Sequence, residues 1–177
     1  MDRSDESSVA VGVYEEHGAA EKAVTALQKA GFDMDKISVV GRDHHAEGEV
    51  VGYYHTGDRM KAWGKRGAFW GGIWGLVLGS AFFAVPGIGP IAVAGPLVNA
   101  LVTALGGAAI VGGSSVLGAA LADLGVPEDM INEYETHLKG DNVIVVCHGS
   151  AGVVQKALAV LQEAGAIHAE IHNVAAG

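Results

Sequence analysis

The chain sets one long uncharged stretch between two segments in which apolar and charged residues alternate at regular spacing. From Gly67 to Ala122 there is no Asp, Glu, Lys, Arg or His, and Gly and Ala are abundant. Such a block is typical of a membrane hairpin or of a segment buried inside an assembly. The functional interpretation depends on which of these it is.

The two flanking segments are copies of one repeat. Residues 9–40 align with residues 143–174 without a gap. Chance does not produce so many identities in one register, so a duplication is the better explanation. The identical positions in the first copy are Val9, Val11, Gly18, Lys22, Ala23, Leu27, Gln28, Ala30, Gly31, Ile37 and Val40.

Each copy reads as strand, helix and strand. Alternating valines after residue 8 predict a strand, and apolar residues at helical spacing from Ala20 to Ala30 predict an amphipathic helix. Gly31 and Gly165 stand where each helix must end. Two such units predict an α+β ferredoxin-like sandwich, split between residues 9–41 and 141–177.

A large insertion separates the two halves. Residues 42–66 read as a polar loop followed by a basic segment, and residues 67–122 as a hydrophobic helical hairpin. The hairpin is predicted as two long helices, broken near Pro86–Pro90. Pro127 then precedes a connecting helix over Glu128–Lys139 within residues 123–140, and Gly140 stops it.

Membrane insertion is the first interpretation of the hairpin. About 20 helical residues span the roughly 30 Å hydrocarbon core. Basic residues precede the first apolar segment, and aromatic residues lie before it and near its start, as is typical of a membrane interface. We therefore expect the hairpin to lie in the lipid bilayer of the inner membrane. The ferredoxin-like domain is then expected in the cytoplasm. The alternative is a soluble cytoplasmic assembly with buried hairpins. The expected membrane-interface residues are Lys61, Trp63, Lys65, Arg66, Trp70 and Trp74.

Small residues at every fourth position predict close helix packing. Interior glycines each cost a helix about 1 kcal/mol relative to alanine, so a stripe of them needs a compensating contact. We expect a homo-oligomer that packs along this glycine zipper. Its residues are Gly67, Gly71, Gly75 and Gly79, with Ala104, Ala108 and Gly112 on the second segment.

Charge and cysteine content narrow the range of possible partners and sites. The net charge of −9 argues against a nucleic-acid partner. The lone Cys147 lies in an apolar run, which indicates a buried thiol and gives no disulfide or zinc framework. Residues 1–8 are acidic, lack the pattern of a signal peptide, and are expected to form a mobile tail.

Candidate chemical sites are few. Asp43, His44, His45 and His55 could bind a metal, but their spacing matches no known framework, and a solvated loop is favoured. Ser150 lies between a strand and a helix without the G-x-S-x-G pattern, so a helix N-cap is favoured. We predict no catalytic residue, no cofactor and no enzymatic activity.

Four stretches carry a resemblance to a known family: VGVYEEHGAAEKAVTALQKAGF, ISVVGRD, VVGYYHTGDRMKAWGKRGAFWGGIWG and PGIGPIAVAGPL. Together they resemble bacterial general stress proteins of the YflT type, which are often labelled membrane proteins of unknown function or low-temperature-induced proteins. The resemblance implies a small stress-induced protein with a glycine-rich hydrophobic middle. It implies no catalytic residues.

Three function classes remain. The first is a non-enzymatic stress-response protein that self-assembles through a membrane-embedded or subunit-buried hairpin. The second is a small-ligand-sensing regulatory module coupled to a membrane hairpin, since ferredoxin-like domains often bind small molecules. The third is a metal-dependent enzyme that uses the His44 and His45 loop.

Overall fold

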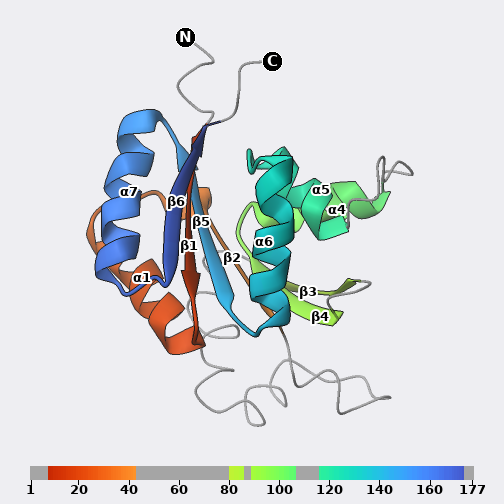
Figure 1. Cartoon of the computed structure of the whole chain (residues 1–177). Coiled ribbons are helices and arrows are strands. Elements are labelled where there is room, and N and C mark those ends of the chain that lie inside the picture. Colours follow the sequence, from red (N-terminus) through yellow and green to blue (C-terminus); the bar gives the residue numbers. More distant parts are fainter. Residues whose placement is uncertain (1–7, 43–79, 86–88, 107–115, 174–177) are drawn as a thin grey trace.

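The computed structural model describes residues 8–42, 80–85, 89–106 and 116–173. These residues form one antiparallel sheet with helices on both faces (Figure 1). The strands are β1 (Ser8–Tyr14), β2 (Ile37–Arg42), β3 (Ser80–Val85), β4 (Gly89–Ala94), β5 (Val143–Gly149) and β6 (His168–Asn173). The helices are α1 (His17–Lys29), the 3-10 turn η2 (Met34–Lys36), α4 (Leu97–Gly106), α5 (Val116–Asp123), α6 (Glu128–Lys139) and α7 (Ala151–Glu163).

All paired strands of the sheet are antiparallel, in the order β3-β4-β2-β5-β1-β6. The strands of the two repeats pair with one another, because β5 lies between β1 and β2, and β1 lies between β5 and β6. β2 follows the first repeat helix and β6 follows the second, and these two strands lie on opposite sides of the central β1–β5 pair.

The fold has three layers, in which a layer of helices covers each face of the sheet and forms a separate core with it. Figure 1 shows α1 and α7 on one face and α4, α5 and α6 on the other. Along β1, Val9, Val11 and Val13 belong to the core on the α6 side, and Ala10 and Tyr14 belong to the core on the α1 and α7 side. Burial of both faces explains why β1 and β5 are almost continuously apolar rather than alternating with polar residues.

The repeat helices end as the sequence predicts. Gly31 and Gly165 both adopt positive φ, at 86° and 93°. The backbone N–H of Phe32 then donates to the Leu27 carbonyl, and the N–H of Ala166 donates to the Leu161 carbonyl. These bonds close the C-termini of α1 and α7 in the same way, as a left-handed glycine allows.

The first strands of the two repeats do not follow the gapless alignment. Tyr14 ends β1 and two residues precede α1, whereas Gly149 ends β5 and Ser150 alone precedes α7. Even-numbered residues of β1 face α1 and α7, but in β5 the odd-numbered Val145 and Cys147 do so. The strands are thus shifted by one residue relative to the aligned helices, and a shift of one residue moves side chains to the opposite face.

The apolar segment near Pro86 differs from the predicted pair of helices. Ser80–Val85 and Gly89–Ala94 are paired strands, so the expected first helix does not continue to Val85. A short apolar run rich in Phe, Val and Ile favours a strand, although its periodicity alone cannot distinguish it from a helix. β4 also pairs with β2 and extends the sheet of the repeats.

Helices α4 and α5 of the second apolar segment pack on this same sheet. Leu97, Leu101, Leu117 and Leu121 are fully buried. The Ser38 hydroxyl of β2 accepts a hydrogen bond from the Leu97 N–H at 3.2 Å, which satisfies a free donor in the first turn of α4. Uncharged residues of this segment therefore contribute to the protein's own core.

Across the described ranges, no helix combines the length and apolar character needed to span a bilayer. α4 has 10 residues and α5 has 8. Residues 67–79, 86–88 and 107–115 of the expected hairpin lie outside the described residues.

The connecting helix α6 has the bounds that the sequence predicts, Glu128–Lys139, with Gly140 as its C-cap. Ile131, Tyr134 and Leu138 are buried against the sheet face that α4 and α5 also cover. Glu128 and Asp129 occupy its first turn, where the helix dipole favours negative charge.

Candidate functional site

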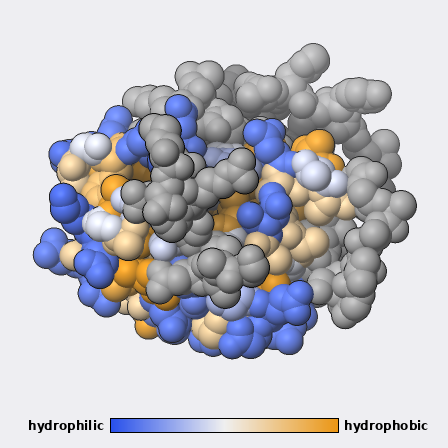
Figure 2. Space-filling model, turned by 90° about the horizontal axis from the view of Figure 1, so that it is seen from above, coloured by the Kyte–Doolittle hydropathy of each residue, from blue (hydrophilic) through white to orange (hydrophobic). Residues whose placement is uncertain are grey.

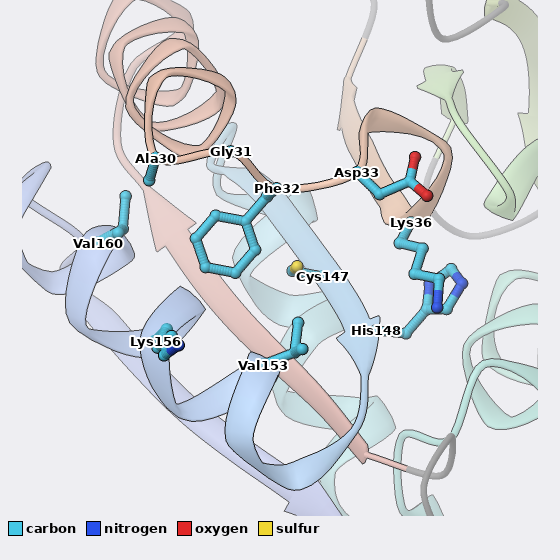
Figure 3. A pocket seen from close by; sticks show the side chains of 10 residues that line it. All are labelled: Ala30, Gly31, Phe32, Asp33, Lys36, Cys147, His148, Val153, Lys156 and Val160. Carbon is cyan, nitrogen blue, oxygen red and sulfur yellow. The ribbon is translucent and has the colours of Figure 1, made fainter.

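A pocket opens between the two repeats, at the C-terminal end of α1. It has a volume of about 460 Å³, which is within the usual range for small-molecule sites. Figure 3 shows α1 and η2 on one side of it, α7 on the other, and β5 behind. Its lining residues are Ala30, Gly31, Phe32, Asp33, Lys36, Cys147, His148, Val153, Lys156 and Val160.

An aromatic ring and aliphatic groups form the inner wall of this pocket. In Figure 3 the Phe32 ring points into the space between α7 and β5, with Val153 and Val160 on the α7 side. Val153 is 37% exposed although it is apolar, because it faces this opening. The wall is therefore suited to the hydrocarbon part of a ligand.

Positive charge predominates among the polar residues that line the pocket. Lys36 on η2 and Lys156 on α7 lie on opposite sides of the apolar wall, and Asp33 supplies the single carboxylate of the lining (Figure 3). The Asp33 carboxylate also accepts a hydrogen bond from the Asp35 N–H at 3.0 Å, which holds it in the turn before η2. The whole chain carries a net charge of −9, so this excess of lysine is a local exception.

Cys147 forms the base of the pocket but is not a reactive thiol. Its side chain is buried, as the sequence predicts. Burial raises the pKa of the Cys147 thiol to about 11, and the charge of Lys36 only partly opposes that rise. A thiol with so high a pKa is a poor nucleophile at neutral pH.

A second polar cluster lies between α6 and β6. The Tyr134 hydroxyl is 2.6 Å from His172 Nε2, and both side chains are buried. Burial raises the pKa of Tyr134 and lowers the pKa of His172, so the pair is a neutral phenol bonded to a neutral imidazole.

Further histidines and carboxylates surround that pair. His168 Nδ1 lies 4.0 Å from the Glu133 carboxylate, and His168 Nε2 lies 3.4 Å from that of Glu170. The His137 and His168 rings stack with centroids 6.1 Å apart. Even so, no three His, Cys, Asp or Glu side chains within the described part of the chain are placed to hold a metal ion.

Most residues singled out in the sequence lie outside the described residues. These are the metal candidates Asp43, His44, His45 and His55, the interface residues Lys61, Trp63, Lys65, Arg66, Trp70 and Trp74, and the small residues Gly67, Gly71, Gly75, Gly79, Ala108 and Gly112. Ala104 is described: it lies on α4, half-buried against the core on the α6 side.

The predicted N-cap position of Ser150 is confirmed, but its side chain makes no capping hydrogen bond. Phe32, Lys36 and Lys156 were not identified from the sequence as site residues. Phe32 follows the end of α1, Lys36 lies in η2 and Lys156 lies within α7, so no common sequence signal marks them. The one-residue strand shift beside the pocket is not visible in a gapless alignment.

Comparison with known proteins gives one match. Neither the curated proteins nor the solved structures provide a significant relative of this chain. Residues 9–83 match the model of the heat induced stress protein YflT domain. That segment contains the whole first repeat and the first residues of β3. The first repeat and the segment after it are therefore similar to the YflT stress-protein domain, which suggests a role in the stress response.

Proposed function

We propose that this protein is a non-enzymatic bacterial stress-response protein that acts as a regulatory module and binds a small organic anion between its two repeats. The ferredoxin-like arrangement of the repeats is part of the proposal. It is supported by the strand order β2-β5-β1-β6 within the sheet and by α1 and α7 sharing one face. The stress context is supported by the YflT match.

The pocket in Figure 3 is the observation that carries the proposal. It combines an apolar wall with two lysines inside a strongly acidic protein. The net charge of the chain disfavours the approach of anions, whereas the two lysines of the pocket attract them, so charge selects the ligand as well as shape.

The position of the pocket gives the ligand a regulatory effect. One wall comes from the first repeat, through Phe32 and Lys36, and the other from the second repeat, through Val153 and Lys156. A ligand that contacts both walls binds only when the strands of the two repeats are paired in one sheet. It therefore stabilises the folded protein, by about 2.7 kcal/mol at a concentration 100-fold above its Kd.

The test is a fluorescence titration with two probes of similar shape. 8-Anilinonaphthalene-1-sulfonate is anionic, and N-phenyl-1-naphthylamine lacks the sulfonate. We expect the wild type to bind the anion more tightly. The double variant Lys36→Gln/Lys156→Gln should lose about fivefold to tenfold in affinity for the anion, and little for the neutral probe.

The matched control is Lys22→Gln/Lys29→Gln, which removes the same charge from the exposed face of α1. It should leave the affinity for the anionic probe within about twofold. Equal loss in both double variants would show that only net charge matters, and saturable binding by neither probe would contradict the proposal.

Self-assembly is a second candidate. In the described part of the chain, β6 is an end strand of the sheet, and Ile167 beside it is 49% exposed. An end strand can pair with the same strand of another copy. Size-exclusion chromatography with light scattering tests this directly, since a monomeric mass at micromolar concentration would rule it out.

A further inference from the structure

The side chain of Tyr14 fills a defined space at the end of β1. It is fully buried, and its hydroxyl donates a hydrogen bond of 2.8 Å to the carbonyl oxygen of Leu161 near the C-terminus of α7. The end of β1 is thus covered by the end of α7, and the aromatic ring closes the gap between them.

The second repeat has no such ring. Gly149 ends β5 as Tyr14 ends β1, and the one-residue shift puts both on the sheet face that α1 and α7 cover. A Cβ built on Gly149 would lie 3.0 Å from Val153 Cγ1 of α7, which confirms that this position faces the helices. In the first repeat the residue aligned with Val153 is the smaller Ala19.

The pocket lies where the missing ring would be. Its lining includes Ala30, Gly31 and Phe32 at the C-terminus of α1, the counterpart of the α7 end that Tyr14 contacts. It also includes Cys147, two residues before Gly149 on the same sheet face, and Val153 after it. The protein therefore fills this space with its own tyrosine in one repeat and leaves it open in the other.

We propose that the pocket binds a planar aromatic acid, whose ring takes the place that the Tyr14 ring occupies in the first repeat. This inference rests on the proposed function and names its ligand class. The ring contacts Phe32, Val153 and Val160, and the acid group lies beside Lys36 or Lys156, the two lysines that flank this apolar wall.

Two features favour an aromatic ring over an aliphatic chain. A flat ring fits a gap between a helix end and a strand, as Tyr14 shows in the other repeat. Phe32 points into the pocket and offers an aromatic partner (Figure 3). Such aromatic pairs bind beyond their buried area, which corresponds to about threefold to tenfold in affinity.

The experiment compares three probes by isothermal titration calorimetry with the full chain. They are 4-hydroxyphenylacetate, which is an aromatic anion, cyclohexylacetate, which is a non-aromatic anion, and tyramine, which is an aromatic cation. We expect 4-hydroxyphenylacetate to bind about threefold to tenfold more tightly than cyclohexylacetate, and tyramine to bind most weakly.

A double variant then tests where the ring lies. Gly149→Tyr/Val153→Ala gives the second repeat the same pair of residues that the first has in Tyr14 and Ala19. The new ring should occupy the pocket and reduce binding of 4-hydroxyphenylacetate at least about tenfold. Val153→Ala alone is measured beside it, so that the loss of binding from the missing Val153 contact can be separated from the loss caused by the new ring. Circular dichroism tests whether each variant is folded. If the double variant is not folded, Val153→Trp is a second way to fill the pocket.

The outcomes separate the two levels of the proposal. Equal binding of both acids would overturn the aromatic ligand class but leave the anion site standing. Binding of tyramine as tight as that of the acids would contradict the role of the lysines, and hence the proposed function. Full binding by a folded, filled variant would show that the ring does not lie at the end of β5.

Discussion

The Tyr134 hydroxyl and His172 Nε2 lie 2.6 Å apart in the interface between α6 and the end strand β6. Because burial raises the pKa of the phenol and lowers that of the imidazole, both groups are neutral at pH 7 and share one hydrogen bond. Protonation of His172 would place a positive charge in this buried interface, so the contact ties the packing of α6 to pH.

Stability should fall as the pH falls through and below about 6.5. The pKa of His172 in the folded protein lies below its ordinary value, mainly through desolvation. The neighbouring His168 adds to this lowering, whereas Glu170, Asp129 and Glu133 oppose it. In this range the unfolded chain binds more protons at His172 than the folded one, so unfolding becomes easier.

Urea unfolding at pH 7.5 and pH 5.5 measures this effect in the wild type and in His172→Asn. The variant keeps a polar partner for Tyr134 but cannot titrate, so its loss of stability on acidification should be smaller. If acidification destabilises both proteins equally, His172 is not responsible for the pH dependence.

Leu101→Ala tests whether the uncharged segment is buried in its own fold. Leu101 is fully buried, whereas the next residue, Val102, is 56% exposed. The Leu101 variant should lose about 2–5 kcal/mol of unfolding free energy, because it leaves a cavity in the core. Val102→Ala should change it by less than about 0.5 kcal/mol.

Denaturant unfolding of the isolated protein without lipid makes this comparison. Similar, small effects of both substitutions would mean that α4 is not packed on the sheet in the free chain.

Gly95→Ala should be among the most damaging small substitutions. Gly95 has φ of +87°, and an added Cβ would collide with the backbone oxygen of Ile37 and lie 2.9 Å from Ser38 Cα. Both the strained backbone and the clash with β2 destabilise the junction of β4 and α4.

Gly18→Ala is the matched control, since its Cβ would meet no atom within 4 Å and it lies in helix α1. There we expect a gain of up to about 1 kcal/mol. Thermal unfolding of both variants is the measurement, and a tolerated Gly95→Ala would contradict the turn described here.

Gly75→Leu tests the small-residue stripe of the uncharged segment. Gly75 lies outside the described residues, and its role in helix packing between protomers remains a prediction. If the stripe holds protomers together, an added leucine side chain should cost about 1–3 kcal/mol at each contact and reduce the particle mass. Light scattering and circular dichroism compare the variant with the wild type, and an unchanged large particle would refute the packing.

Sequence reasoning identified the elements whose ends have local causes. Pro127 and Gly140 mark the two ends of α6, and Gly31 and Gly165 end the repeat helices with positive φ. It misjudged Ser80–Val85 because a short, mostly apolar run has a periodicity that fits a strand as well as a helix. Its pairing with β4 depends on distant residues of the sheet.

The pocket could not be predicted, because it depends on a structural difference between two repeats that align without a gap. Sequence alignment pairs Tyr14 with His148, but the strand ends pair Tyr14 with Gly149. A shorter connection before α7 causes that shift, and only the register of β1 with β5 reveals it. Figure 2 shows hydrophilic and apolar residues interspersed over one outer face, so surface colouring alone does not identify the site either.

The most direct test of the ligand site is a ¹⁵N–¹H correlation spectrum recorded during titration with 4-hydroxyphenylacetate. We predict that the largest saturable shift changes occur at the amides of Gly31, Phe32, Lys36, Val153 and Lys156, while Leu101 of α4 and Tyr134 of α6 stay unchanged. No saturable change at millimolar ligand, or changes centred on α6 and β6, would contradict the account.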